Sequence, residues 1–370
     1  MNTARRIAIE VTLACDGACR FCAQQGLARK DVSAAAVAQA IAEAAAAGHE
    51  ITLTGGEPTR RAELTQWVAM ARELGAPAVG LQTHGRALAD AALTTNLVDA
   101  GLTDIHLSIH GARPEVHDYH TSATGSLTAT LDGLRALRQR GPEITVVAST
   151  VVTRSNFRVL AELPARLRAW GVTAWSLRWP QTTGGAEAAF DRIVPRLGLA
   201  APFVLHAAAV ARREGLAVVI AGLPSCVLGP MAELAQTTRR RSHGEVCNGC
   251  PSYDGCPGVD AHYLRRFGPG ELHRVDERMA ARPTGANSGR TSPALARMFV
   301  GIGRTAPPRT LTETVADSPQ RARARLPVLG RPDPAEQEVR RHDTPNTAAL
   351  PGLFPALFDA DNDADNDVDT

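Results

Sequence analysis

The stretch RIAIEVTLACDGACRFC, residues 6–22, decides the fold because it joins a strand pattern directly to three cysteines. Residues 6–13 are rich in apolar and β-branched side chains, as a buried strand is. Cys15, Cys19 and Cys22 follow at once with the spacing C-x3-C-x2-C, and Gly17 lets the loop between them bend tightly. The sequence therefore predicts a strand whose end carries a group of thiols in one short loop.

Strand and helix patterns alternate from this stretch onward. The expected strands are residues 6–13, 50–54, 78–83, 104–109, 144–152 and 174–179, and the clearest helices are residues 32–47, 61–74, 87–100, 127–140 and 158–170. Six β-α alternations with short connections predict parallel strands and right-handed crossovers. We expect an α/β fold, a partial (β/α)6 TIM-like barrel, with a further helix near 202–213 and a strand near 216–220.

Composition places limits on the class of protein. Of 370 residues, 44% are hydrophobic and 21% charged, which is typical of a chain with a substantial core. A net charge of +2 and only 4% aromatics disfavour a specific nucleic-acid partner. No run approaches the length of a membrane span and no export signal is evident, so we predict a cytoplasmic protein with no membrane partner. Cysteines that stay reduced there indicate metal binding or catalysis.

The chain changes character at Leu223. From there to about residue 278 it is rich in Cys, Gly and Pro and poor in periodicity, and beyond it Pro, Arg, Thr and Asn accumulate. We therefore expect three parts: a barrel over residues 1–222, a small Cys-rich domain over 223–278, and a largely disordered tail over 279–370. The Asp-rich end lacks the central Gly and final Glu of a calcium loop.

The first cysteine group suits a cuboidal iron–sulfur cluster. Three thiolates from one loop bind three irons and leave the fourth without a protein ligand. A zinc loop or three incidental buried thiols are the alternatives, and spacing alone does not decide between them, although no nearby fourth Cys or His completes a zinc site. A position at the carboxyl end of the first strand favours a functional site, because active sites of β/α barrels lie on that face.

Two motifs together resemble the radical S-adenosylmethionine (radical SAM) superfamily. They are C-x3-C-x2-C with Phe21 before its last Cys, and Thr54-Gly55-Gly56-Glu57-Pro58 at the end of the second strand. The resemblance covers about residues 6–180. It implies a catalytic [4Fe-4S] cluster on Cys15, Cys19 and Cys22 with S-adenosylmethionine (SAM) on its open iron. One-electron cleavage of SAM would yield a 5′-deoxyadenosyl radical that abstracts hydrogen from a substrate.

The same resemblance implies which residues contact SAM. They are Gly55, Gly56, Glu57, Thr83, Ser108, Ser149 and Arg178. His84 departs from the Thr-Asn-Gly that relatives often carry after the third strand. For each polar residue a plain turn or capping role is the alternative, and Glu57 could instead hold its turn or place a charge at a helix start. A metal site among His106, His110, His117 and His120, the last two expected in a loop, is disfavoured because most such histidines are simply hydrogen-bonded.

A second group comprises Cys226, Cys247, Cys250 and Cys256, spaced C-x20-C-x2-C-x5-C. Four thiolates complete either a fully ligated [4Fe-4S] cluster or a zinc site. Three plus four accounts for all 7 cysteines of the chain. The segment resembles the SPASM and twitch domains, the auxiliary-cluster extensions of many radical SAM enzymes, although a full SPASM domain carries more cysteines. The resemblance favours a second iron–sulfur cluster over zinc.

Three hypotheses for the function follow. The first is a radical SAM enzyme that modifies a peptide or protein, and the second is one that acts on a small molecule or cofactor precursor. The third, a non-catalytic iron–sulfur or zinc protein, is disfavoured because it needs no Gly55-Gly56-Glu57 motif. The resemblance implies an electron donor such as flavodoxin or ferredoxin. Because the barrel begins almost at residue 1, we expect a separate protein to deliver a peptide. The run Arg239, Arg240 and Arg241 is expected to be either a solvated loop or a basic surface that binds an acidic substrate.

Overall fold

The computed structural model describes residues 5–27, 30–236 and 242–275. The chain divides into two units, Met1–Leu311 and Thr312–Thr370, and the second lies outside the described residues. The tail predicted for 279–370 and the three arginines at 239–241 also lie outside them. The domain limits expected at residues 222 and 278 stay a prediction.

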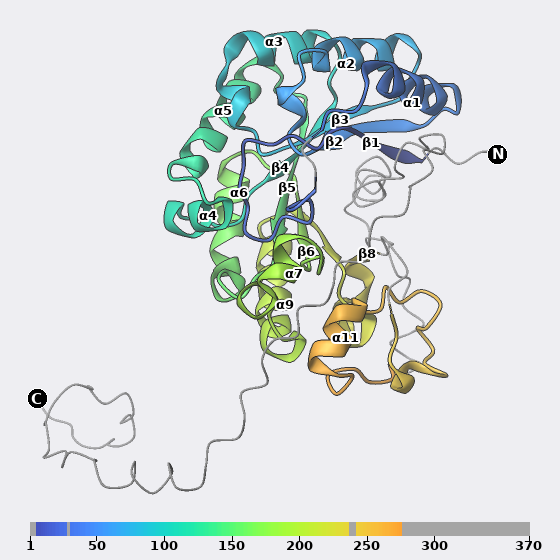
Figure 1. Cartoon of the computed structure of the whole chain (residues 1–370). Helices are drawn as coiled ribbons and strands as arrows, with labels where there is room; N and C mark the ends of the chain where they lie inside the picture. Colours follow the sequence, from blue (N-terminus) through green and yellow to red (C-terminus); the bar gives the residue numbers. More distant parts are fainter. Residues whose placement is uncertain (1–4, 28–29, 237–241, 276–370) are drawn as a thin grey trace, which may run out of the picture. The chain divides into compact units, whose positions relative to one another are not determined.

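One parallel sheet organises the described chain (Figure 1). Its strands follow sequence order: β1 (Arg6–Thr12), β2 (Glu50–Gly55), β3 (Val79–Thr83), β4 (Asp104–Ser108), β5 (Thr145–Val151), β6 (Ala174–Arg178), β7 (Ala217–Ala221) and β8 (Ala235–Gln236). Every neighbouring pair is parallel. The predicted α/β half-barrel is confirmed, and its sheet has eight strands where the sequence predicts six barrel strands and one further strand. β7 is the strand expected near 216–220, whereas β8 is only 2 residues long, too short to leave a pattern in the sequence.

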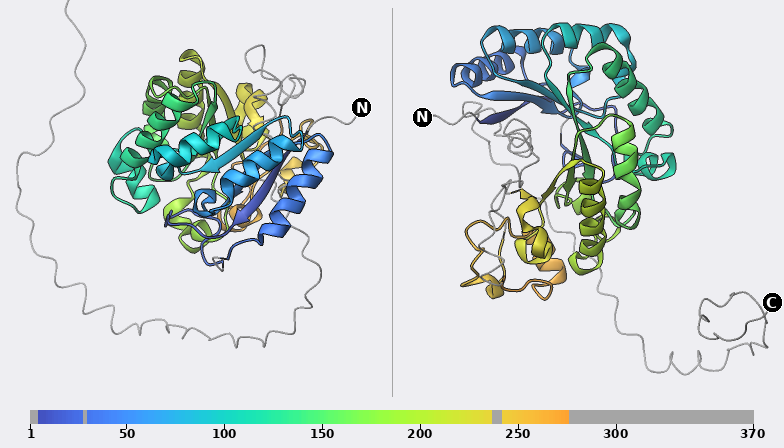
Figure 2. Two further views of the ribbon diagram at one scale, coloured as in Figure 1. Left: turned by 90° about the horizontal axis from the view of Figure 1, so that it is seen from above. Right: turned by 180° about the vertical axis from the view of Figure 1, so that it is seen from behind.

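Helices cover the outer side of the strands (Figure 2). The longer ones are α1 (Ala34–Ala46), α2 (Leu64–Glu73), α3 (Ala91–Asp99), α5 (Ser126–Arg140), α6 (Leu163–Ala169) and α9 (Leu197–Arg213). The shorter ones are α4 (Pro114–Thr121), α7 (Gly185–Ala188), α8 (Phe190–Ile193), α10 (Ser225–Leu228) and α11 (Ala261–Phe267), with 3-10 turns η1 (Pro58–Arg60), η2 (Arg86–Ala89), η3 (Phe157–Glu162), η4 (Gly229–Leu234) and η5 (Glu245–Cys247). Among the described residues, no helix has the length and apolar character to cross a membrane.

Capping side chains decide where several helices begin. The Ser33 hydroxyl accepts a hydrogen bond from the Ala36 N–H (3.3 Å), so α1 starts two residues after the expected point. The Asp90 carboxylate accepts from the Ala92 N–H (2.8 Å) and starts α3. The preceding residues, expected to be α-helical, form the separate turn η2 instead.

The two faces of the sheet differ because successive side chains of a strand alternate. Outward residues such as Leu53, Leu81 and Leu107 are fully buried in the main core. The inner face carries polar side chains and, near its base, Arg6. The Arg6 guanidinium donates to Asp104 (2.7 and 2.8 Å) and to Glu50 (3.1 Å). Burial acts to lower the pKa of Arg6, but these two carboxylates raise it overall, so the charged group closes the amino-terminal end of the sheet.

Candidate functional site

Three thiols gather in the loop between β1 and α1, at the carboxyl edge of the sheet. The Gly17 N–H donates a hydrogen bond to Cys15 Sγ at 3.2 Å. A Cβ atom at Gly17 would lie 3.3 Å from Cys15 Sγ and 3.8 Å from Cys19 Sγ. The sulfurs of Cys15 and Cys19 therefore both lie beside Gly17, which has no side chain. Cys22 closes the turn by donating its N–H to the Cys19 carbonyl at 3.1 Å.

Burial and mutual repulsion disfavour thiolates in this loop when no cation is present. Burial raises the pKa of Cys15, and burial together with the charges of Cys22 and Cys15 raises the pKa of Cys19 to about 12. In the described chain these three sulfurs do not all lie within 4.8 Å of one another. A bound cation would lower these pKa values and favour the thiolate forms that a metal or cluster requires.

The glycine turn after β2 presses against the start of the cysteine loop. Gly56 donates its N–H to the Thr12 carbonyl (2.7 Å), and Glu57 donates to the Ala14 carbonyl (2.8 Å). A Cβ at Gly55, whose φ is 147°, would lie 2.1 Å from the Thr12 oxygen, and one at Gly56 would lie 2.2 Å from the Ala14 oxygen. These glycines thus permit a close approach between two backbone segments.

Glu57 ties the glycine turn to the end of β3. Its carboxylate is buried and accepts hydrogen bonds from the Thr59 N–H (3.2 Å) and hydroxyl (2.7 Å). It also accepts from the Thr83 hydroxyl (2.6 Å) and the His84 N–H (2.9 Å). The Thr83 hydroxyl in turn accepts from the Gly85 N–H at 2.9 Å. Glu57 and Thr83 are therefore both engaged by the protein itself.

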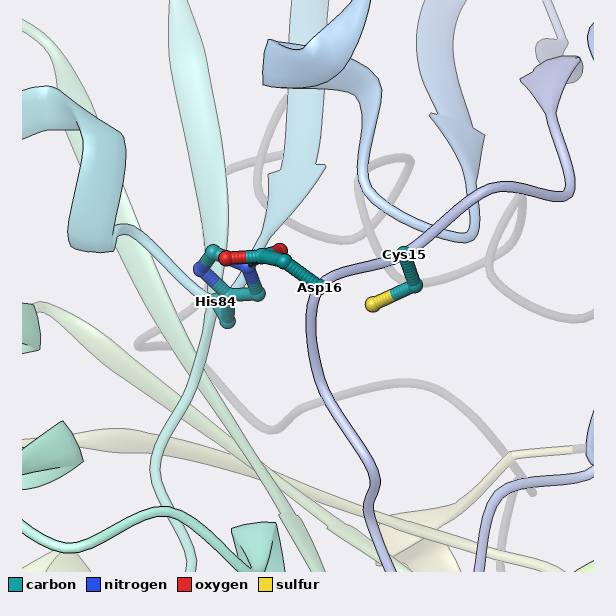
Figure 3. A group of neighbouring side chains, drawn as sticks. All are labelled: Cys15, Asp16 and His84. Atoms are coloured by element: carbon teal, nitrogen blue, oxygen red, sulfur yellow. Dashed lines mark hydrogen bonds and ion pairs between the residues drawn. The ribbon is translucent and has the colours of Figure 1, made fainter.

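His84 extends this network to the cysteine loop. Its Nδ1 accepts the Arg86 N–H (3.2 Å), so Nε2 carries the proton and donates to Asp16 Oδ1 at 2.8 Å. Figure 3 shows the Asp16 carboxylate against the His84 ring, with Cys15 beside Asp16 on the same loop. Burial acts to raise the pKa of Asp16, but the hydrogen bond from His84 and the charge of Arg86 lower it overall.

Cys15, Asp16 and His84 also have the spacing of a metal site, because one ligand atom of each lies within 4.8 Å of the others. The hydrogen bonds argue against such a site. The lone pair of His84 Nδ1 is used by Arg86 and its Nε2 proton by Asp16, so neither nitrogen is free to bind an ion. The Arg86 guanidinium holds the second Asp16 oxygen at 3.1 Å.

Ser108, Ser149 and Arg178 lie on the inner face of the half-barrel. Ser108 is in register with Ser149, which is in register with Ser176 of β6. Arg178 lies two residues beyond Ser176 and so on the same face. These three expected SAM contacts therefore share the face that the cysteine loop adjoins at the carboxyl edge of the sheet.

A group of buried histidines supports the cysteine loop from α4. His117 and His120 lie on this helix rather than in the loop expected there; Pro114 at its first position is the missed sequence signal. The Arg20 N–H donates to the His120 carbonyl (3.0 Å), and the Phe21 ring meets the His110 ring edge-on at 4.7 Å. Burial lowers the pKa of His117 to about 4 and that of His110 well below its usual value, so both rings are neutral.

The second cysteine group lines one pocket. Its lining residues are Pro224, Cys226, Ser242, His243, Cys247, Cys250, Tyr253, Cys256, Gly258, Leu272, His273 and Val275. Backbone N–H groups of Ser225 and Gly258 donate to Cys256 Sγ, each at 3.4 Å. Burial, with the charges of neighbouring thiols, raises the pKa of Cys226 and Cys247. Among the residues the structure describes, no three of these four sulfurs lie within 4.8 Å of one another.

His243 also lines this pocket, although no motif in the sequence singles it out. Its ring lies 4.5 Å from the Tyr253 ring, and its Nε2 is buried without a hydrogen-bond partner in the described chain. A lone histidine just before a Cys-rich run carries no distinctive spacing.

Curated relatives match the barrel half of the chain. A probable GTP 3′,8-cyclase of Sulfolobus acidocaldarius is 30% identical over 159 residues, covering 42% of this chain and 49% of that protein. An AdoMet-dependent heme synthase of Oleidesulfovibrio alaskensis is 28% identical over 186 residues, covering 49% and 47%. The chain thus spans about half the length of these relatives.

Solved structures share the fold. Streptococcus suis SuiB bound to S-adenosylmethionine superposes with a TM-score of 0.51 at 14% identity, covering 62% of this chain and 52% of that one. SuiB bound to its precursor peptide SuiA gives 0.50 at 15% identity, covering 62% and 51%. The family model described as the Radical SAM superfamily matches residues 9–163. This match includes both the cysteine loop and the glycine turn, so the chain is similar to the Radical SAM superfamily over residues 9–163.

Proposed function

We propose that this chain cleaves S-adenosylmethionine reductively at a [4Fe-4S] cluster held by Cys15, Cys19 and Cys22. The observation that carries the proposal is the joining of the cysteine loop to the Gly55-Gly56-Glu57 turn by two backbone hydrogen bonds at the carboxyl edge of the sheet. Such a cluster, given one electron by a flavodoxin- or ferredoxin-type donor, would split SAM into methionine and a 5′-deoxyadenosyl radical that takes a hydrogen atom from the substrate.

The chain's own residues provide the surroundings for this chemistry. Phe21 and the neutral rings of His110 and His117 pack behind the loop and keep water from that side. Ser108, Ser149 and Arg178 offer hydrogen bonds and one positive charge on the inner face, which suits the carboxylate and ribose of SAM. Because Glu57 and Thr83 are engaged by protein donors, we assign them a supporting role in the SAM pocket.

We propose a second [4Fe-4S] cluster at Cys226, Cys247, Cys250 and Cys256. The four thiols line one pocket, which supports a single shared centre, and the resemblance to SPASM and twitch domains favours iron–sulfur over zinc. Two backbone N–H groups donate to Cys256 Sγ, and hydrogen bonds to sulfur are among the features that tune iron–sulfur centres. This centre, similar to those of SPASM and twitch domains, would bind the substrate or accept an electron after hydrogen abstraction.

For the substrate we propose a peptide or protein. SuiB, which shares the fold, has a structure bound to its precursor peptide, and this supports the choice. Buried side-chain atoms of His106, Ser176 and Gln236, all on the inner face, have no hydrogen-bond partner in the described chain. Each of these uncharged groups can both donate and accept, as the amide groups of a peptide require.

A small-molecule substrate is the second candidate. The curated relatives are by name a GTP 3′,8-cyclase and a heme synthase, and they match the barrel more closely in sequence than the SuiB structures do. The electron donor, a separate peptide-delivery protein and the cytoplasmic location stay predictions for either candidate.

The test begins with anaerobic reconstitution using iron and sulfide. We expect two clusters by iron and sulfide counts, a change in the electron paramagnetic resonance (EPR) spectrum when SAM is added, and 5′-deoxyadenosine after reduction. Cys19→Ala should abolish the spectral change and the release. Cys250→Ala is the matched control, because it should lose the iron of one cluster but keep uncoupled release. The proposal would be excluded if wild-type protein binds no iron, or if its EPR spectrum does not change when SAM is added.

The substrate class is tested by stimulation. Candidate peptides, GTP and iron porphyrins are added separately, and the rate of 5′-deoxyadenosine release is measured. Stimulation by a peptide alone supports the first candidate, and stimulation by GTP or a porphyrin alone supports the second.

A further inference from the structure

We propose that His84 is a positioning residue that holds the cysteine loop and the glycine turn in one fixed arrangement by bridging Asp16 and Glu57. The inference rests on the proposed function, since it concerns how the SAM site is built. In this arrangement His84 acts through Asp16 and Glu57 and does not itself contact the cluster or SAM.

The bridge joins three segments that are far apart in the sequence. The His84 Nε2–H donates to Asp16 Oδ1 at 2.8 Å, and Nε2 also lies 3.3 Å from Glu57 Oε2. The His84 backbone N–H donates to the same Glu57 oxygen at 2.9 Å. Because Asp16 directly follows Cys15, holding its carboxylate limits the directions in which Cys15 can present its thiol.

His84 is itself held rigidly. Its carbonyl accepts the Thr130 hydroxyl of α5 at 2.9 Å, and its Nδ1 accepts the Arg86 N–H at 3.2 Å. Only 15% of its side chain is exposed, so water competes weakly for the Asp16 hydrogen bond. A histidine fixed in position, orientation and tautomer can act as a rigid spacer.

The length of the side chain matters for this role. The donor to Asp16 is the far ring nitrogen Nε2. A glutamine places its amide nitrogen at about that distance from the backbone, whereas an asparagine amide corresponds to Nδ1 and is too short. Glutamine at 84 should therefore rescue the bridge, and asparagine should not.

The experiment compares His84→Ala, His84→Asn, His84→Gln and Asp16→Ala with the double variant His84→Ala/Asp16→Ala. His206→Ala, at an exposed position of α9, is the matched control. Two quantities are measured: the SAM affinity of reconstituted protein by EPR titration, and the rate at which iodoacetamide alkylates Cys15 in the apo-protein, followed by peptide mass spectrometry.

We expect His84→Ala and Asp16→Ala each to weaken SAM affinity about tenfold and to speed Cys15 alkylation about tenfold, as the loss of one charge-assisted hydrogen bond predicts. The double variant should be no worse than either single variant, since all three lack the same bond. His84→Gln should stay within about twofold of wild type, and His84→Asn should behave as His84→Ala.

Fully additive single effects, or an unchanged alkylation rate in His84→Ala, would overturn the inference. If His84→Ala fails to fold, the contrast between the Gln and Asn variants decides instead. The alkylation arm uses no SAM, so the bridge is still tested if wild-type protein fails to respond to SAM. That second failure counts against the proposed function alone.

Discussion

The phenol oxygen of Tyr263 accepts a hydrogen bond from the backbone N–H of Leu197 at 2.7 Å, which ties α11 to the first residue of α9. The buried Tyr263 also donates to the Glu271 carboxylate. Glu271 in turn accepts the Gly198 N–H at 2.9 Å. The Cys-rich segment thus provides both an acceptor and a negative charge at the N-terminus of a barrel helix, where each is favourable.

Tyr263→Phe should destabilise this attachment. Removing the hydroxyl leaves the Leu197 N–H without its acceptor, at a cost of about 1–3 kcal/mol in the free energy of unfolding, measured with urea. Arg266→Ala is the control. It removes an exposed ion pair with Asp191 (3.0 Å) and should change stability by less than about 1 kcal/mol. Equal effects of the two substitutions would show that the Tyr263 bond has no special role.

Gly56→Ala should disrupt the cysteine loop. The new methyl group would lie 2.2 Å from the Ala14 carbonyl oxygen, and that backbone cannot move without breaking the Glu57–Ala14 hydrogen bond. We expect a loss of about 3 kcal/mol in stability and poor iron retention after reconstitution. Gly270→Ala is matched to it, because a Cβ there would have no neighbour within 4 Å. If Gly56→Ala binds iron as wild type does, the close approach is not required.

His106 should make the protein sensitive to acid. Burial, helped by the charges of Arg6 and Arg178 and opposed by Asp104, lowers its pKa from 6.5 to about 3. Between these values the unfolded chain binds a proton that the folded protein does not, so stability falls as the pH drops from 6.5 towards 3.

His106→Leu should therefore reduce the difference in unfolding free energy between pH 7 and about pH 5. The substitution also removes two buried nitrogens that have no hydrogen-bond partner in the described chain, so the apo-protein at neutral pH should be no less stable than wild type. Unfolding with urea at both pH values checks both expectations. An unchanged pH dependence would show that His106 is accessible to protons in the folded state.

The first cysteine site should load better at higher pH. With a pKa of about 12, Cys19 is a protonated thiol at neutral pH in the apo-protein, and a metal ligand must lose that proton. The rate of cluster reconstitution should therefore rise with pH until the chain or the reagents become unstable. Proton release on loading, followed with a pH indicator, is the direct measurement. A rate that falls with rising pH would contradict the raised pKa.

The strands and helices of the barrel could be predicted because each leaves a local pattern. Alternation of apolar runs with helical periods fixed the parallel topology, and the glycines at helix ends marked the connections. β8 escaped prediction because 2 residues show no periodicity. α4 escaped because five of its eight residues are polar or charged and weaken its apolar face, leaving Pro114 as its main signal.

The candidate site could be predicted only in part. A motif indicates which residue types belong to a site, whereas the hydrogen-bond partners of those residues are set by the folded chain. The cysteines and glycines stand out by spacing, and their roles stay proposals. The bridge from Asp16 through His84 to Glu57 spans residues 68 and 27 apart in sequence, and no local pattern records such pairings. In the sequence alone, His84 stands out only because it differs from the Thr-Asn-Gly pattern expected after the third strand.

The backbone around the three cysteines is attached to elements distant in the chain. Besides the glycine turn, α4 holds it through Arg20, and the Gly185 N–H donates to the Cys22 carbonyl at 2.8 Å. Small zinc domains, by contrast, acquire their shape only when the ion arrives. Here the conformational entropy of the loop is lost when the sheet and its helices fold, so the binding loop is preformed before a cluster arrives. The apo-protein should therefore remain folded during purification without iron.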